Sequence, residues 1–176
     1  MHSEAYYKKL RKKYTPVLCR LIFVFESPPE SDEYFYNDKG SINEPLFKFM
    51  MKCFCPFNPV QKSNGLKEFA RLGILIVDAV YKPINKLGAK QKKELILKNY
   101  PGLEADLKKI VGKNHTRIAI VGNGLRKIIE PMLEKKFYVI NDGENIPFPL
   151  YGHQKKFTDK IRFLFVIHNV NLELFC

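Results

Sequence analysis

The chain has 176 residues, of which 30 are Lys or Arg and 18 are Asp or Glu, so its formal net charge is +12. A chain of this length buries roughly 70% of its unfolded surface and needs neither disulfides nor a metal to fold. Its 45% hydrophobic residues exclude intrinsic disorder. The apolar run Leu21–Phe25 is far shorter than the ~18 residues of a membrane span. We therefore expect one soluble domain, with neither a transmembrane helix nor a signal peptide.

The four cysteines are Cys19, Cys53, Cys55 and Cys176. They lack both the paired spacing of zinc sites and the density of a secreted disulfide scaffold. Cys53 and Cys55 lie in an apolar, aromatic stretch, where small buried thiols are common. We expect a reducing cytoplasm, no bound metal and no other cofactor.

The charge is uneven along the chain. Residues 1–20 carry six bases and one acid, whereas residues 21–45 carry one base and six acids. Bases outnumber acids again by nine to three in residues 86–117 and by eight to five in residues 126–162. A basic shell around an acidic centre would favour nucleic-acid phosphates. Lysines that only solvate helix faces would give the same pattern.

Short apolar runs alternate with stretches of helical spacing. We predict a basic N-terminal helix within residues 1–19, centred on residues 3–14. Four buried strands are then predicted at residues 20–25, 73–80, 117–122 and 137–141. Helices are predicted at residues 42–53, 90–111 (interrupted at Pro101 and Gly102), 123–135 and 157–174, the last closing a segment that runs to residue 176. Because the strands are apolar on both faces, we predict a single three-layer α/β/α domain over residues 1–176, with a four-stranded parallel sheet.

The first strand is followed by Glu26-Ser27-Pro28-Pro29 and then by an acidic loop that contains Tyr34-Phe35-Tyr36. Two consecutive prolines fix the backbone and prevent a helix from starting there. A carboxylate beside rigid prolines and aromatic rings suits a site that holds a water molecule and stacks a planar ligand. The alternative is a turn with ordinary surface tyrosines.

Asp78 stands within the apolar second strand. A carboxylate there is costly unless it is paired or hydrogen-bonded, which makes Asp78 a candidate site residue. The alternative is a structural carboxylate that pairs with Lys82 or with a helix N-terminus.

After the third strand, Gly122-Asn123-Gly124 forms a tight turn into a helix, but it lacks the Lys-Ser/Thr of a nucleotide P-loop. Asn123 is a candidate to face the crevice at the carboxyl ends of the strands, where such folds bind ligands.

After the fourth strand, a proline-stiffened loop leads into a basic helix start. That loop could lie against a nucleic-acid backbone, with phosphates bound at the helix start. Its residues with this candidate role are Pro147, Pro149, Tyr151, Lys155 and Lys156. The alternative is a plain surface loop.

In this order, the motifs resemble those of the uracil-DNA glycosylase superfamily over residues 20–163. Phe25-Glu26-Ser27-Pro28 matches the second and fourth places of the family's first motif. Asp78 falls where the family usually has an Asn that reads the base edge. Residues 146–150 match the last motif in their prolines and leucine only.

The resemblance implies a monofunctional DNA glycosylase that hydrolyses the N-glycosidic bond of a damaged, deaminated base during DNA repair. Glu26 would orient or activate water, with Ser27 assisting. Asp78 would read the base, and Phe35 or Tyr36 would stack on it. Asn123 and His153 are further candidates for base binding and catalysis, respectively. The implied partner is DNA, bound by a monomer with no membrane or obligate protein partner, in the cytoplasm and, in a prokaryote, at the nucleoid.

Two departures from the family pattern bear on this reading. Ser27 stands where the family keeps an activating Asp or Asn, and it carries no negative charge. Ile146 replaces the His that assists the leaving base, so His153 is the candidate replacement. An ionised Asp78 only accepts hydrogen bonds, which suits a base with N–H donors, or uracil if the acid is protonated. The cysteine spacing does not match an iron–sulfur site.

These departures leave two rival hypotheses. One is a catalytically inactive nucleic-acid-binding module on the same scaffold. The other is an enzyme that acts on free nucleosides or nucleotides, for which a basic shell would be unnecessary.

Overall fold

The computed structural model describes residues 2–31, 33–111 and 115–176. Its centre is a four-stranded, all-parallel sheet with the strand order β2-β1-β3-β4. The strands are β1 (Leu21–Phe25), β2 (Ile74–Asp78), β3 (Arg117–Ile120) and β4 (Tyr138–Val139). The predicted parallel sheet is therefore confirmed, although β4 is shorter than the apolar run from which it was predicted.

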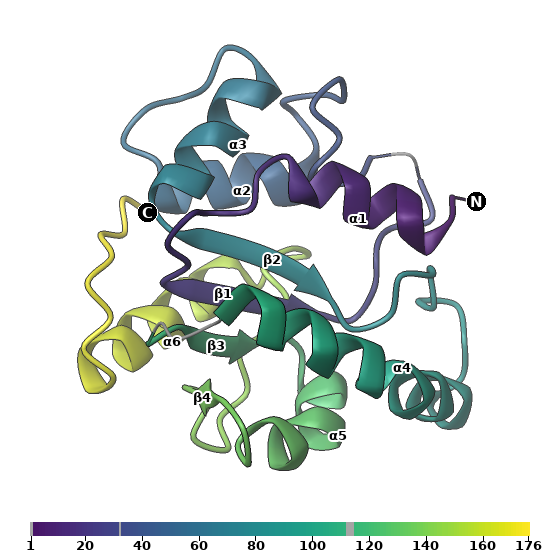
Figure 1. Cartoon of the computed structure of the whole chain (residues 1–176). Coiled ribbons are helices and arrows are strands. Elements are labelled where there is room, and N and C mark those ends of the chain that lie inside the picture. The colour runs from purple at the N-terminus through teal and green to yellow at the C-terminus, as the bar shows by residue number, and fades with distance from the viewer. Residues whose placement is uncertain (1, 32, 112–114) are drawn as a thin grey trace.

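Helices cover both faces of this sheet. They are α1 (Glu4–Lys12), α2 (Pro45–Phe54), α3 (Lys62–Arg71), α4 (Ala89–Val111), α5 (Asn123–Leu133) and α6 (Gln154–Ile167). One layer contains α1, α4 and α5, and the other contains α2, α3 and α6 (Figure 1). The predicted three-layer α/β/α architecture is confirmed. Within the described ranges, no helix combines the length and the apolar character needed to cross a membrane.

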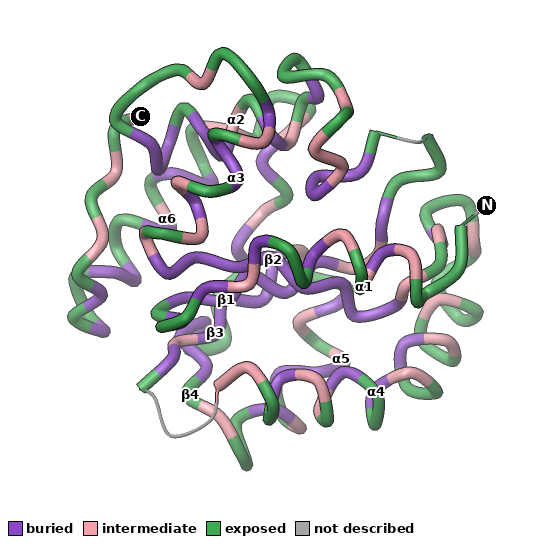
Figure 2. Tube along the Cα trace, turned by 45° about the horizontal axis from the view of Figure 1, so that its top comes forward, coloured by how far each residue is buried: buried purple, intermediate pink, exposed green. Residues whose placement is uncertain are grey.

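Strand β1 lies at the centre of the core. Its five apolar residues are all buried because it pairs with β2 on one side and β3 on the other. Phe23 packs with its ring centre 5.7 Å from that of Phe54 in α2 and 5.9 Å from that of Phe157 in α6. Buried residues follow the strands and the inner sides of the helices in Figure 2. This packing explains why the strand sequence is apolar on both faces.

Two helices differ from the sequence prediction. Helix α4 continues through Pro101, so the predicted interruption at Pro101 and Gly102 is wrong. Its buried residues before and after the proline (Ile96, Tyr100, Leu103 and Leu107) keep helical spacing, so packing compensates for the lost hydrogen bond. Helix α3 was not predicted; Gly65 lies within it.

Both terminal segments contain less helix than predicted. Helix α1 covers only nine residues of the N-terminal segment. Helix α6 ends at Ile167, and Asn169 then adopts a left-handed conformation (φ 50°), which stops the helix. The remaining residues return to α2, where the Phe175 N–H donates to the Cys53 carbonyl (2.8 Å).

The cysteines differ from the expectation that all four are free thiols. A disulfide joins Cys53 to Cys176, whereas Cys19 and Cys55 are buried free thiols.

Candidate functional site

A cavity of about 450 Å³ opens at the carboxyl ends of β1, β2 and β3. Phe25 pairs with Asp78 in the sheet register, and residues two apart on a strand point to the same face. Phe25, Ile76 and Asp78 therefore all face this cavity, on the side of the sheet covered by α2, α3 and α6. The site lies at the edge of the sheet where parallel folds bind ligands, as the sequence predicts.

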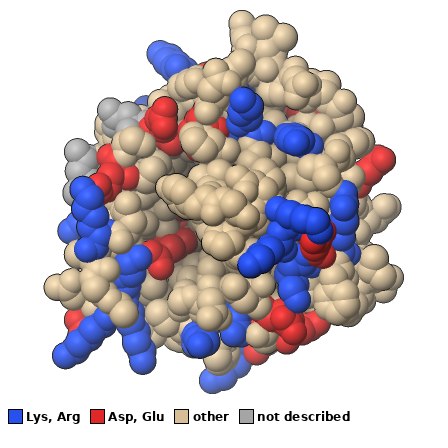
Figure 3. Space-filling view, turned by 180° about the vertical axis from the view of Figure 1, so that it is seen from behind, with Lys and Arg blue, Asp and Glu red and all other residues tan. Residues whose placement is uncertain are grey.

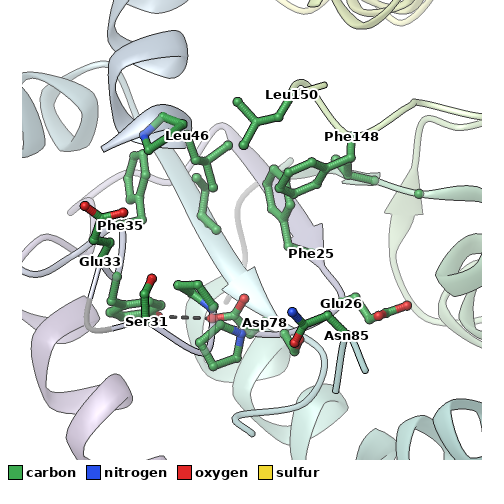
Figure 4. Close-up of a pocket in the computed structure, with 18 of the residues that line it drawn as sticks. Phe25, Glu26, Ser31, Glu33, Phe35, Leu46, Asp78, Asn85, Phe148 and Leu150 are labelled. Atoms are coloured by element: carbon green, nitrogen blue, oxygen red, sulfur yellow. Dashed lines mark hydrogen bonds between the residues drawn. The ribbon is translucent and has the colours of Figure 1, made fainter. Parts of the chain in front are cut away.

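Aromatic and aliphatic side chains form two opposing walls. Phe35 and Leu46 lie on one side, and Phe25, Phe148 and Leu150 lie on the other (Figure 4). The Phe25 and Phe148 rings pack edge to face, with their centres 5.5 Å apart. Phe35 is only 3% exposed, so its ring is held by the core. The space between these walls suits a planar, apolar-faced ligand.

Asp78 forms the polar floor of the cavity. Its side chain is buried, and its Oδ2 accepts a hydrogen bond from the Tyr34 hydroxyl (3.1 Å). Burial raises the pKa of Asp78 to about 7, although the Tyr34 hydrogen bond and the charge of Arg11 act in the opposite direction. Asp78 therefore changes charge near neutral pH.

The nearest buried cation does not neutralise Asp78. Arg11 instead forms a bidentate contact with Asp106 in α4 (2.7 and 2.9 Å), and it also donates to the Tyr81 hydroxyl. Among the described residues, Asp78 has no ion-pair partner, neither Lys82 nor any other cation. Asp78 is therefore not paired with Lys82, and its partner is the Tyr34 hydroxyl.

Glu26 lies at the rim of the same cavity. Its carboxylate accepts a hydrogen bond from the Lys92 ammonium of α4 (2.7 Å), and the two side chains are 31% and 25% exposed. Figure 4 shows the Glu26 carboxylate turned away from Asp78. The structure thus brings both predicted acids to one cavity but places them in different environments.

The Ser27 hydroxyl oxygen contacts the neighbouring loop. Its Oγ accepts a hydrogen bond from the backbone N–H of Ile84 (3.4 Å), in the loop that follows β2. The Glu26 carbonyl likewise accepts from the Val80 N–H (3.1 Å). These contacts hold the loop after β2 against the end of β1.

The acidic aromatic loop contributes Phe35 but not Tyr36. Tyr36 is 1% exposed, lies outside the cavity lining, and accepts a hydrogen bond from the Ile76 N–H on its hydroxyl (2.7 Å). The candidate role of Tyr36 in base stacking is therefore wrong, because its ring is fixed in the core. Tyr34 and Tyr36 are both buried, which also excludes an ordinary surface turn.

A buried ion pair holds the wall that carries Phe35. The Lys62 ammonium donates to the Tyr34 carbonyl (2.9 Å) and lies 3.6 Å from the Glu44 carboxylate. Glu44 in turn accepts from the N–H groups of Leu46 and Phe47, at the start of α2 (both 2.9 Å). Lys62 and Glu44 therefore join the aromatic loop, α2 and α3 into one side of the cavity.

Asn123 and His153 do not reach the cavity. Asn123 begins α5, and its amide oxygen accepts from Arg126 (3.2 Å), while the adjacent Gly122 and Gly124 line the cavity. His153 is exposed at the start of α6, outside the lining. Both residues are exposed, and neither lines this cavity.

The loop before α6 forms the outer rim. Phe148, Leu150 and Tyr151 line the cavity mouth, whereas Pro147 and Pro149 support the loop from outside the lining. Tyr151 is 89% exposed and has a φ of 56°, a conformation that few non-glycine residues adopt. This rim presents aromatic surface to solvent.

Basic residues lie on the same side of the molecule as a surface hollow. Figure 3 shows Lys and Arg side chains around a hollow in which acidic atoms are visible. Lys155 and Lys156 are exposed at the start of α6, and Lys155 pairs with Asp159 (2.8 Å). Lys86 pairs with Glu30 (2.7 Å) near the rim. The predicted basic shell is therefore partly neutralised by acids.

Sequence reasoning missed Asn85, Glu44 and Lys62. Asn85 lines the cavity beside Asp78, but a polar residue in a loop is ordinary in a sequence. Lys62 and Glu44 are separated by an unremarkable stretch, and no spacing rule pairs them. Among the described residues there is no group of three or more His, Cys, Asp or Glu that could hold a metal ion.

Searches of protein-family models, curated proteins and solved structures found no match to this chain. The geometry of the cavity therefore carries the functional argument.

Proposed function

We propose that the protein is a DNA glycosylase, which hydrolyses the N-glycosidic bond of a damaged base that has been flipped out of the strand. The observation that supports this proposal most is the shared cavity of Glu26 and Asp78, two acids at the ends of neighbouring strands. Its aromatic walls suit a nucleobase, and its position at the sheet edge suits entry from outside.

The two acids fit different parts of this reaction. Cleavage of an N-glycosidic bond develops positive charge on the sugar, which a rim carboxylate can stabilise while it orients water. Glu26 takes this role once its side chain turns from Lys92 toward the cavity. Asp78 lies deeper and contacts the edge of the base, while Phe35 packs against its face.

The surroundings of the mouth fit a DNA strand. Tyr151 and Phe148 offer exposed rings to neighbouring bases, and Lys155 and Lys156 offer charges to phosphates. Binding through such charges weakens as salt concentration rises, because phosphate-bound counterions are released.

Base release from defined oligonucleotides tests the proposal. Single- and double-stranded oligonucleotides that carry uracil or hypoxanthine are incubated with the protein and then treated with hot alkali. We expect strand breaks at the modified position and none in the unmodified sequence. If stoichiometric protein produces no alkali-labile site in any of them, the enzymatic proposal is contradicted.

A nucleic-acid-binding module without catalysis is the second candidate. The engagement of Glu26 by Lys92 favours it, because this carboxylate is not free in this structure. This candidate predicts salt-sensitive DNA binding that Glu26→Gln leaves unchanged, together with no base release by the wild type. Base release that disappears in Glu26→Gln, with binding intact, would exclude it.

A further inference from the structure

The loop after β2 brings one exposed polar side chain, Asn85, to the edge of the cavity. Ile84 is 1% exposed, and its N–H donates to Ser27 Oγ while its carbonyl accepts from the Leu87 N–H (3.0 Å). The next residue, Asn85, therefore leaves an anchored backbone. Its side chain lines the cavity and lies beside Asp78 in Figure 4.

The Asn85 amide has no hydrogen-bond partner among the described residues, although its neighbours on the cavity floor do. Asp78 Oδ2 is occupied by the Tyr34 hydroxyl, which leaves Oδ1 for a ligand. An amide provides both a donor and an acceptor, and an ionised carboxyl oxygen provides an acceptor. The cavity therefore offers one acceptor from the buried Asp78 on its floor and, at its exposed edge, the amide of Asn85.

We propose that Asn85 is a specificity residue, which binds the ligand edge together with Asp78 and selects a lactam, a ring N–H next to a ring C=O. The ring N–H donates to Asp78 Oδ1, and the Asn85 amide N–H donates to the ring carbonyl oxygen. Adenine and cytosine present a bare ring nitrogen where the lactam has N–H, and when Asp78 is ionised that nitrogen would face the Asp78 oxygen without a hydrogen between them. This mismatch selects against them, since a buried polar group without a partner is costly.

The inference rests on the proposed function for its choice of a nucleobase, but its test requires neither DNA nor catalysis. Binding of free uracil and hypoxanthine is measured by NMR titration slightly above neutral pH, where Asp78 is largely ionised. The pyrimidine probes are 1-methyluracil, whose only ring N–H is the lactam N–H, and 1,3-dimethyluracil, which lacks it. The purine probes are 1-methylhypoxanthine, which lacks the lactam N–H, and adenine. The variants are Asn85→Ala and, as a control, Asn145→Ala, which alters an exposed Asn outside the cavity.

We expect the wild type to bind each lactam roughly tenfold or more tightly than its methylated partner or adenine. Asn85→Ala should lose about tenfold in lactam affinity and most of this preference, whereas Asn145→Ala should retain both. Equal binding by Asn85→Ala and wild type would overturn the inference, and so would a wild type that binds no free base. Lactam binding without base release from DNA would contradict the glycosylase proposal but would support the inference about Asn85.

Discussion

The floor and the rim of the cavity contain the same chemical group in opposite settings. Asp78, on the floor, is buried, hydrogen-bonded to a neutral Tyr34 and without an ion-pair partner among the described residues. Glu26, on the rim, is partly exposed and paired with Lys92. A buried carboxyl group and a partly exposed, ion-paired carboxylate can take two different roles in one site. Residue type alone therefore does not assign these roles. The burial of each carboxyl group and its bonding partner assign them.

The largest expected effect comes from removing the rim charge. Glu26→Gln keeps the shape of the side chain but can neither take up a proton nor stabilise positive charge on the sugar. We expect base release to fall by roughly 100- to 10,000-fold with little change in DNA binding. Single-turnover kinetics and a gel-shift titration measure the two quantities. Glu30→Gln, which alters another rim acid paired with a lysine, serves as the control and should release the base at the wild-type rate.

The floor is expected to affect stability with a definite pH dependence. The pKa of Asp78 is about 7 in the folded protein and 3.8 in the reference state, so the folded state binds its proton more tightly. This contribution favours the folded state at low pH and is lost as pH rises between those two values. Relative to Asp78→Asn, the wild type should lose about 4 kcal/mol of unfolding free energy between about pH 4 and about pH 8.

Urea unfolding of both proteins across this range measures the difference. The comparison with Asp78→Asn removes the contributions of other groups, such as Asp38, whose pKa is lowered. If the unfolding free energies of the two proteins change with pH in parallel, Asp78 does not have a raised pKa in the folded protein.

A smaller effect is expected from the buried Lys62–Glu44 pair that supports the wall carrying Phe35. Lys62→Met leaves the Glu44 carboxylate without its partner and releases the Tyr34 carbonyl. We expect a loss of about 3 kcal/mol in unfolding free energy, partly recovered when Glu44→Gln is added. Chemical denaturation measures both, with Lys67→Met, an exposed lysine of the same helix, as the control. If Lys62→Met is no more destabilising than that control, the pair does not hold this wall.

The smallest effect is expected from the pair on the rim. Lys92→Met removes a partly exposed ion pair for which water competes, so the unfolding free energy should fall by less than about 1 kcal/mol. Lys93→Met, at the next, exposed position of α4, gives the background change. A loss in Lys92→Met that equals the loss in Lys62→Met would remove the distinction between the exposed pair on the rim and the buried pair in the wall.

The sheet and the position of the site could be predicted because both follow from strong, local signals. The apolar runs of β1, β2 and β3 read as buried strands, and polar residues directly after them fall at the ligand-binding edge. Which of Phe35 and Tyr36 lines the cavity could not be predicted from the sequence, because it depends on the backbone conformation of the loop that carries them. Only the structure shows that the Tyr36 hydroxyl is used by the backbone of β2.

Other features depend on contacts between distant segments. Helix α3 contains a glycine that helix propensity disfavours. A Cβ on Gly65 would lie 2.7 Å from a ring carbon of Phe47 and 2.8 Å from the sulfur of Met51, so α3 uses glycine to approach α2 closely. In the same way, Asn85 reaches the cavity on a loop that Ser27 and the Glu26 carbonyl hold against the end of β1.

A crystal structure of the Glu26→Gln variant, with an oligonucleotide that contains uracil or hypoxanthine, tests the central claim most directly. The account predicts that the modified base lies outside the DNA stack, between Phe35 and Phe148, with its edge against Asp78. A bound oligonucleotide whose modified base remains stacked, with the cavity empty, would contradict it.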